Sequence, residues 1–132
     1  MNNKKQIENM TDSNVLIAKF MGFSPREDGT WHIYYEDWDD FFEPEEMEYH
    51  HRWSWLMTVV EKIESINTGV DEDSFYNVVI DYPECRIEIN YPPPTGNWNL
   101  CNGICEVGEN KKHSVFKAVV KFIKWYNENN NN

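Results

Sequence analysis

Residues 75–90 read FYNVVIDYPECRIEIN, two strand-like runs separated by a short turn. The first run, Phe75–Tyr82, is rich in the β-branched and aromatic residues that favour strands. Apolar and polar residues alternate strictly in the second run, Cys85–Asn90, which is typical of a strand with one buried and one wet face. The turn at Pro83 and Glu84 is too short for a parallel crossover, so the two runs predict an antiparallel hairpin.

Helical stripes of apolar residues lie on both sides of this hairpin in the sequence. Apolar residues at i, i+3, i+4 and i+7 predict helices over 51–66 and 111–127. A shorter helix is predicted over 11–21, because capping side chains begin it and Gly22 can take the left-handed position that ends it. The stripes of the two longer helices consist of Leu56, Val59, Val60 and Ile63, and of Phe116, Val119, Val120 and Ile123.

The remaining segments complete an α+β pattern. Alternating residues predict a strand over 30–35, and a weaker strand is expected over 100–107. The acidic segment 36–48 is predicted to be a loop that runs into a helix. Because the order α-β-α-β-β-(β)-α lacks regular βα alternation, we predict an α+β fold in which a small antiparallel sheet of three to four strands is layered with three helices.

The length of 132 residues suits one domain, and no linker-like stretch divides the chain. Residues 1–132 are therefore expected to share one core, which at this size needs neither a metal nor a disulfide. The polar ends, residues 1–10 and 128–132, are expected to fray.

The chain carries 12 Lys and Arg against 23 Asp and Glu, a formal net charge of −11. This charge repels phosphate and anionic lipid, so neither non-specific nucleic-acid binding nor membrane binding is expected. It suits a basic protein surface or a cation, and it also simply keeps a protein soluble. No apolar run approaches the roughly 20 residues of a membrane span, no secretory signal follows Met1, and three cysteines fit reduced thiols, so a cytoplasmic setting is expected.

The most unusual composition lies between Trp31 and Trp55, where carboxylates and aromatic rings are interleaved. Rings supply apolar anchors and acids attract a basic partner, so this segment is a candidate partner-binding surface. The alternative is that the rings close the edge of the core while the acids stay in water. A calcium site is not expected, because the glycine and the loop frame of an EF-hand are missing. The candidate partner-binding residues are Trp38, Asp39, Asp40, Phe41, Phe42 and Trp53.

The proline-rich stretch 91–98 is a second candidate site, because a rigid loop can present stacking rings to a small molecule. Its candidate ligand-binding residues are Arg86, Tyr91 and Trp98, with a nucleobase stacked on the indole of Trp98. The chain carries no phosphate-binding glycine loop, nucleophile elbow or zinc-protease motif. Enzyme activity is therefore not favoured, and no cofactor is expected.

A Cys₃His zinc site can be composed from Cys85, Cys101, Cys105 and His113. The spacing of these residues is not that of a zinc knuckle. Cys85 also falls on the buried face of its predicted strand, where a small apolar side chain needs no role beyond packing. No metal site is therefore expected.

Two adjacent histidines, His50 and His51, are the remaining candidates for chemistry. Neighbouring side chains point apart on a helix or a strand, so two separate roles are expected for them. One histidine beside Glu46 or Glu48 can act as a general base, but no nucleophile motif accompanies it. An ordinary surface position at a helix start is the alternative.

Three segments resemble the phage ABA sandwich domain family, a group of small proteins of bacteriophages and prophages. They are Asn14–Gly22 (NVLIAKFMG), Trp55–Glu64 (WLMTVVEKIE) and Ala118–Glu128 (AVVKFIKWYNE), and the strand Tyr76–Ile80 also matches. The resemblance implies a sheet layered with helices and an origin in a phage or in a bacterial host cytoplasm. It implies no catalytic residues.

Three functions follow from these patterns. The first is a non-catalytic binding protein, a phage or prophage accessory protein that occupies a host or phage protein and inhibits a host defence protein. The second is an oligomeric protein that sequesters a small molecule or a nucleotide signal. The third, and least favoured, is a metal-dependent hydrolase that uses the histidines.

Overall fold

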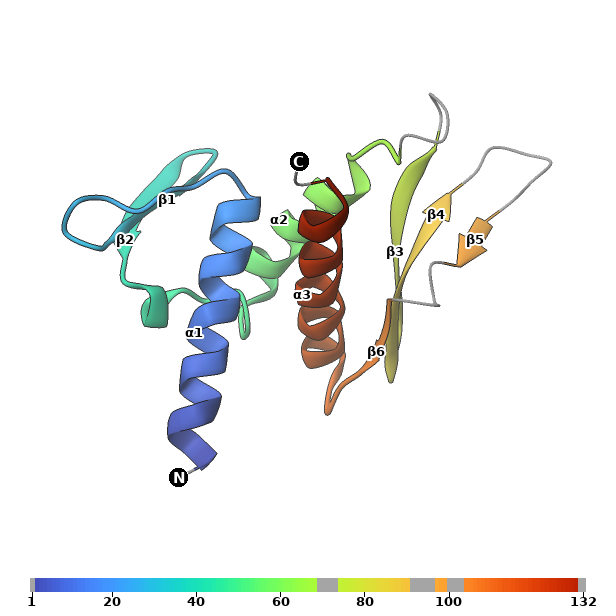
Figure 1. The fold of residues 1–132 in the computed structure, drawn as a ribbon, viewed down its shortest axis with the longest axis horizontal. Helices are drawn as coiled ribbons and strands as arrows, with labels where there is room; N and C mark the ends of the chain where they lie inside the picture. The colour runs from blue at the N-terminus through green and yellow to red at the C-terminus, as the bar shows by residue number, and fades with distance from the viewer. Residues whose placement is uncertain (1, 69–73, 91–96, 100–103, 131–132) are drawn as a thin grey trace.

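The computed structural model describes residues 2–68, 74–90, 97–99 and 104–130. Three helices lie between a two-stranded sheet on one side of the molecule and a larger sheet on the other (Figure 1). In chain order the elements are α1 (Asn2–Phe20), β1 (Trp31–Tyr35), β2 (Trp38–Phe42), the 3₁₀ turn η1 (Pro44–Glu46), α2 (Trp53–Glu64), β3 (Phe75–Asp81), β4 (Glu84–Asn90), β5 (Asn97–Asn99), β6 (Cys105–Val107) and α3 (Lys111–Asn130).

The predicted α+β class with three helices is confirmed, but the strands of the described residues form two small antiparallel sheets instead of one. Strand 30–35 is confirmed as β1, and it pairs with β2 and not with the larger sheet. The prediction of a loop and helix over 36–48 was wrong, because this segment contains β2 and η1. Asp39 and Asp40 hid the strand in the sequence, since aspartate is depleted in strands and breaks their alternation.

The larger sheet is built on the predicted hairpin. β3 and β4 pair along their whole length, from Phe75 opposite Asn90 to Asp81 opposite Glu84. β5 and β6 pair with opposite ends of β4. The weak strand predicted over 100–107 is confirmed at Cys105–Val107, which form β6. Residues 100–103 lie outside the described part. The rigid loop predicted over 91–96 lies outside the described part, and Asn97 and Trp98 of the proline-rich stretch belong to β5.

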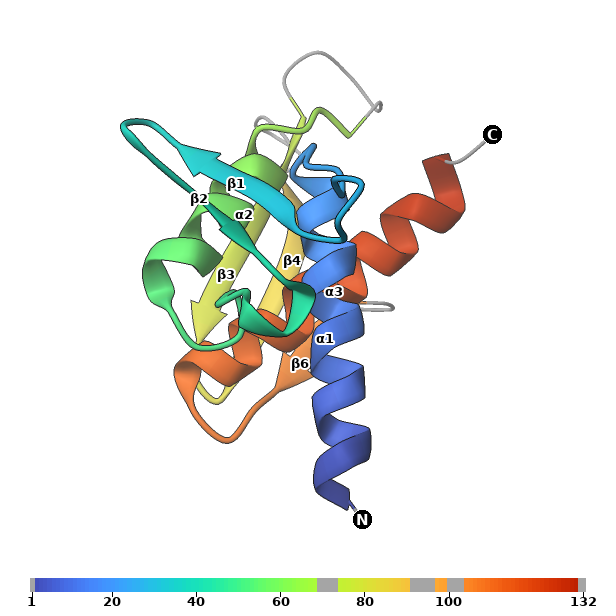
Figure 2. The ribbon, with the colours of Figure 1, turned by 90° about the vertical axis from the view of Figure 1, so that its left-hand side faces the viewer.

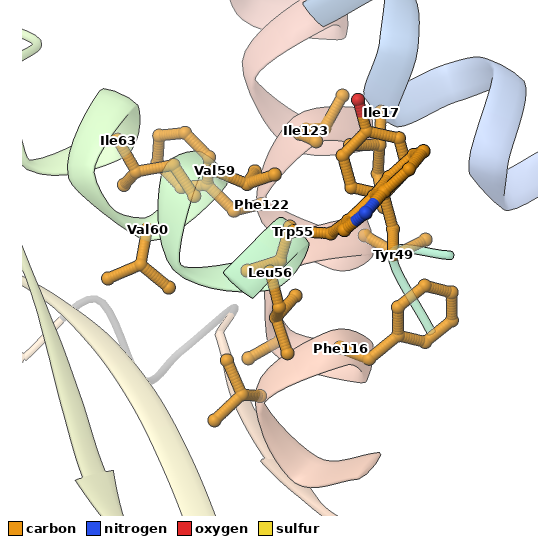
Figure 3. Packing of buried hydrophobic residues seen from close by; sticks show 14 of the residues in the cluster. Ile17, Tyr49, Trp55, Leu56, Val59, Val60, Ile63, Phe116, Phe122 and Ile123 are labelled. Atoms are coloured by element: carbon orange, nitrogen blue, oxygen red, sulfur yellow. The ribbon is translucent and has the colours of Figure 1, made fainter. Parts of the chain in front are cut away.

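The core lies between the helices and the inner face of the larger sheet. Both predicted stripes are buried, as is the Cys85 and Ile87 face of β4. Figure 3 shows the stripe of α2 against Phe122 and Ile123 of α3, with Ile17 of α1 beside them. Burying one such aliphatic or aromatic side chain contributes about 1.5–3 kcal/mol relative to exposure. The helical stripes therefore supply much of the stability of the fold.

Helix α1 is longer than the sequence predicted, since it begins at Asn2 and not at Thr11. No glycine or proline interrupts the first turns, so the helix continues through the capping residues 11–13. Its end is as predicted: Gly22 has a φ of +94°, and the amide of Phe23 bonds the carbonyl of Ala18 at 3.0 Å. The predicted fraying of the chain ends stays a prediction.

The hairpin of β1 and β2, residues 31–42, faces the viewer in Figure 2. Its strands are joined by the two residues Glu36 and Asp37, and Glu36 has a left-handed φ of 53°. The segment after it is fixed to α1 by Asn14, whose side-chain amide donates to the carbonyls of Pro44 at 3.2 Å and Met47 at 3.1 Å. The position of the hairpin on the helices is therefore set by a buried polar side chain.

Candidate functional site

The β1–β2 hairpin has two faces of different character. Side chains alternate along each strand, and directly opposed residues share a face. The inner face carries the buried Trp31 and Ile33, which close the core on this side. The outer face carries His32 and Tyr34 from β1 and Asp39 and Phe41 from β2, and it points away from the core.

Aromatic rings of the outer face are stacked in a row. The ring of Tyr34 lies 5.0 Å from Phe23 and 5.2 Å from His32, and His32 stacks on Phe41 at 4.8 Å. The guanidinium of Arg26 lies 4.5 Å from the centre of the Phe41 ring, a cation–π contact. We call these five residues the outer ladder. Two of its rings remain largely open to solvent, since Tyr34 is 56% and Phe41 49% exposed.

The outer ladder borders an open hollow of about 470 Å³, whose floor includes Gly22, Ser24 and Pro25. One hydrogen bond orients the imidazole of His32, whose Nε2 lies 3.0 Å from a carboxylate oxygen of Asp39. Both partners are exposed, so water can reach this pair. The hollow is thus a ready-made surface for contact and not an enclosed chamber.

A narrower space lies under the inner face, between the hairpin and α2. The ring of Trp55 is its base, and Tyr49 at 4.9 Å and Phe42 at 5.0 Å hold that ring edge-on. Trp38 lies over Trp55 with a centroid distance of 6.0 Å. The enclosed space is about 30 Å³, and Phe23 and Tyr34 line both this space and the outer hollow. We call it the inner slot; its other lining residues include Ile33, Tyr35, Ser54 and Thr58.

Carboxylates surround both spaces. From Phe23 to Glu48, Arg26 is the sole Lys or Arg of the sequence. The acids act on one another and on the rings. The hydrogen bond that protonated Glu43 donates to Glu45, together with the charge of Glu45, raises the pKa of Glu43, and the charges of Glu61 and Glu36 raise the pKa of Tyr35. The hairpin therefore projects a negative field around its exposed rings.

The six predicted partner-binding residues are divided by this geometry. Asp39 and Phe41 lie on the outer face. Trp38, Asp40 and Phe42 lie on the inner face, where Trp38 and Phe42 contact Trp55. Trp53 is exposed at the first residue of α2, outside the hairpin.

Sequence reasoning missed four members of the outer ladder: Phe23, Arg26, His32 and Tyr34. The alternation of His32 and Tyr34 with apolar neighbours was a usable signal, since it placed both on the wet face of a strand. Phe23 and Arg26 had no such signal. They reach the ladder because the chain reverses at Gly29, which has a φ of +88°.

The predicted small-molecule site is described only in part. Tyr91 and the side chain of Trp98 lie outside the described residues. Arg86 is held by carboxylates, at 3.3 Å from Glu88 and 3.2 Å from Glu84. Bonds to these two acids raise the pKa of its guanidinium. The charge that would bind a phosphate is already engaged within the protein.

The four predicted zinc ligands also lie partly outside the described residues, because Cys101 is not described. Burial raises the pKa of the Cys85 thiol to about 12, which disfavours the thiolate that zinc requires. The Sγ of Cys105 lies 3.6 Å from Glu84, and Nδ1 of His113 accepts the amide of Glu109. In the described ranges, no three His, Cys, Asp or Glu side chains are grouped to hold a metal.

The rings of His50 and His51 do not point apart, which corrects the expectation for neighbouring residues. They lie in a turn, where Nε2 of His50 is 2.9 Å from Nδ1 of His51. Nε2 of His51 is 3.1 Å from Glu48. Because a carboxylate only accepts, the network assigns one proton to each Nε2 and leaves Nδ1 of His50 bare. That nitrogen is buried without a described partner, and burial followed by the charge of His51 lowers the pKa of His50.

Comparison with known proteins gives no relative: no family model, no curated protein and no solved structure matches this chain. The resemblance to the phage family therefore stays a prediction. Within the part of the chain that the structure describes, none of the helices has the length and apolar character to cross a bilayer. The function must be argued from the hairpin itself.

Proposed function

We propose that this protein acts by non-catalytic binding, with the β1–β2 hairpin docked against a basic surface of a partner protein. The observation that carries the proposal is the outer ladder, whose rings are stacked and exposed within a surround of carboxylates. Exposed apolar patches rimmed by polar residues are typical of protein–protein interaction sites.

Aromatic residues and arginine are enriched in the residues that dominate binding energy at interfaces. The rings of the outer ladder already contact one another, so little side-chain freedom is lost when a partner covers them. The carboxylates add long-range attraction, which speeds encounter with a basic surface and rejects acidic ones. Apolar contact and charge therefore select the same class of partner.

Catalysis by the same residues is less well supported. His32 and Asp39 are 39% and 65% exposed at the side chain, in an open hollow. Catalytic groups usually lie in closed sites that exclude water from the reaction. The nucleotide-sequestering alternative is also weaker, because Arg86 is paired with Glu84 and Glu88.

The resemblance to phage proteins extends this proposal. The partner would then be a protein of the bacterial cytoplasm, and occupation of its basic surface would block its activity in host defence. Net negative charge supports such a role, because a protein surface that binds nucleic acid is basic and an acidic protein can cover it.

The test is a quantitative affinity purification from bacterial lysate with three baits: the natural protein, a Tyr34→Ala and Phe41→Ala double variant, and a Phe75→Ala control. Phe75 is an exposed ring on the larger sheet, away from the hairpin. We expect a basic protein that the natural bait and the control retain, that the double variant loses, and that salt releases. Equal recovery by the double variant would refute the hairpin as the docking element.

A further inference from the structure

The inner slot differs from the outer ladder in that it is a small space walled by aromatic rings, with room for the head of one side chain. Two of its lining rings, Tyr35 and Trp38, are open to solvent, each with 40% of its surface exposed. Its base is Trp55, which is 7% exposed and held edge-on by Tyr49 and Phe42. A base fixed by packing and lining rings open to solvent are the features of a preformed recognition pocket.

The size of the inner slot restricts its occupant. The space is about 30 Å³. In the same measure a single water needs about 10–15 Å³, and pockets for drug-sized ligands run to roughly 300–1,000 Å³. A nucleobase therefore does not fit, whereas the slim head of one extended side chain does.

The chemistry of the walls selects a cation. The faces of Trp38, Trp55 and Tyr35 carry the negative side of the ring quadrupole, which attracts ammonium and guanidinium groups. The carboxylates of Glu36 and Glu61 act on the Tyr35 hydroxyl and raise its pKa. Neither carboxylate is in an ion pair with a residue that the structure describes. Their charge is available to a group that enters from outside.

We propose that the inner slot takes the charged head of one lysine or arginine side chain of the basic partner, with the stem of that side chain against Trp38 and its head against the Trp55 ring. This inference rests on the proposed function and makes it more specific. The outer ladder contacts a broad area of the partner, and the inner slot recognises one basic residue.

The first test titrates ¹⁵N-labelled protein with the peptides Ac-Gly-Gly-Xaa-Gly-Gly-NH₂, in which Xaa is lysine, arginine or norleucine. We expect saturable shifts of the indole NH signals of Trp38 and Trp55 with lysine or arginine. Norleucine has the apolar stem without the charge, so it should give none. Equal shifts with norleucine, or no shift at up to about 10 mM of any peptide, would overturn the inner slot as a cation site.

Matched variants separate the two faces of the hairpin. Trp38→Leu and Phe41→Leu each remove one exposed ring of β2, on the inner and outer face respectively. Trp38→Leu should lower the affinity for the lysine peptide by about 10-fold, while Phe41→Leu should change this affinity by no more than about twofold. Glu61→Gln, an exposed change that cannot disturb the core, should weaken binding by about threefold. Equal effects of the two ring variants would overturn the proposal.

The partner captured from lysate distinguishes this inference from the proposed function. If Trp38→Leu retains the partner at full affinity while the Tyr34 and Phe41 double variant loses it, the inner slot is wrong and the docking hairpin stands. If neither variant affects capture, both are wrong. Thermal unfolding of each variant checks that a loss of binding is not a loss of fold.

Discussion

The two hairpins of this protein share a plan and differ in what they do with it. Both are antiparallel, and in both only two residues lie between the paired strands. The β3–β4 hairpin buries Cys85 and Ile87 against the helices, and Arg86 on its outer face is paired with acids. The β1–β2 hairpin leaves its acids and the rings of Tyr34 and Phe41 exposed. One hairpin stabilises the fold, and the other presents a surface.

The edges of the hairpins differ in the same way. In β3 the edge amide of Val78 donates to the carboxylate of Glu64 at 3.1 Å, and Phe75 bridges to Asn67. Such contacts protect an edge from pairing with other chains. β4 is paired on both sides. Polar groups paired within the protein therefore characterise the structural β3–β4 hairpin, whereas exposed charges characterise the β1–β2 hairpin, which is suited to recognition.

The largest expected difference between the two hairpins is in the stability lost when an apolar side chain is truncated. Ile87→Ala should lower the free energy of unfolding by about 2–5 kcal/mol, because it leaves a cavity at a fully buried position. Phe41→Ala, on an exposed face, should change it by no more than about 0.5 kcal/mol. Urea denaturation measures both. A cost for Phe41→Ala as large as that for Ile87→Ala would mean that the outer ladder is structural.

Removal of one negative charge should lower the free energy of unfolding at the β3–β4 hairpin and raise it beside the β1–β2 hairpin. Glu88 is 9% exposed and bonds Arg86, so Glu88→Gln should destabilise the protein by about 1–2 kcal/mol. Glu45→Gln, just after β2, removes repulsion from Glu43 and should slightly raise the free energy of unfolding. The same denaturation series checks the signs. Two losses of stability would show that the acids near the hairpin are also satisfied.

Lowering the pH should lower the free energy of unfolding, because of His50. The folded pKa of His50 is lowered from 6.5 by burial and by His51, so below that pH the unfolded chain binds more protons. Stability is then complete above pH 6.5 and falls as the pH drops toward the folded pKa. His50→Gln should remove this part of the pH dependence in thermal unfolding between pH 7 and pH 5, as expected from the direction of the shift. His32→Gln, on the hairpin, is the control and should retain it.

The smallest effect is expected at the tip of the exposed hairpin. Glu36 holds a left-handed φ of 53°, which asparagine adopts at lower cost. Glu36→Asn should therefore raise the free energy of unfolding by about 0.5 kcal/mol, and its matched control Asp37→Asn should leave it unchanged within error. A loss of stability with Glu36→Asn would show that the glutamate side chain supports the turn.

The parts of the fold that could be predicted from sequence are those with one large buried face. The stripes ending at Ile63 and Ile123 and the alternation around Ile87 follow fixed periods, which local physics alone can specify. β2 could not be predicted, because adjacent Phe41 and Phe42 place one ring on each face and Asp39 and Asp40 oppose strand formation. Pairing with β1 overrides these local preferences.

Composition indicated the region of the candidate site but not its shape. The interleaved rings and acids of residues 31–55 predicted a binding surface, and the hairpin lies within that segment. The contacts of Phe23 and Arg26 depend on a chain reversal, and that of Trp38 with Trp55 depends on tertiary packing. Neither is encoded in a local period, so neither could be derived from the sequence.

The amide of Asn14 has a mechanical consequence. Its two hydrogens are given to the carbonyls of Pro44, the first residue of η1, and of Met47, the residue after it, so the segment that follows the hairpin is tied to the middle of α1. A force that a bound protein applies to the hairpin therefore reaches α1 by two routes: these two hydrogen bonds, and residues 21–30, which join α1 to β1.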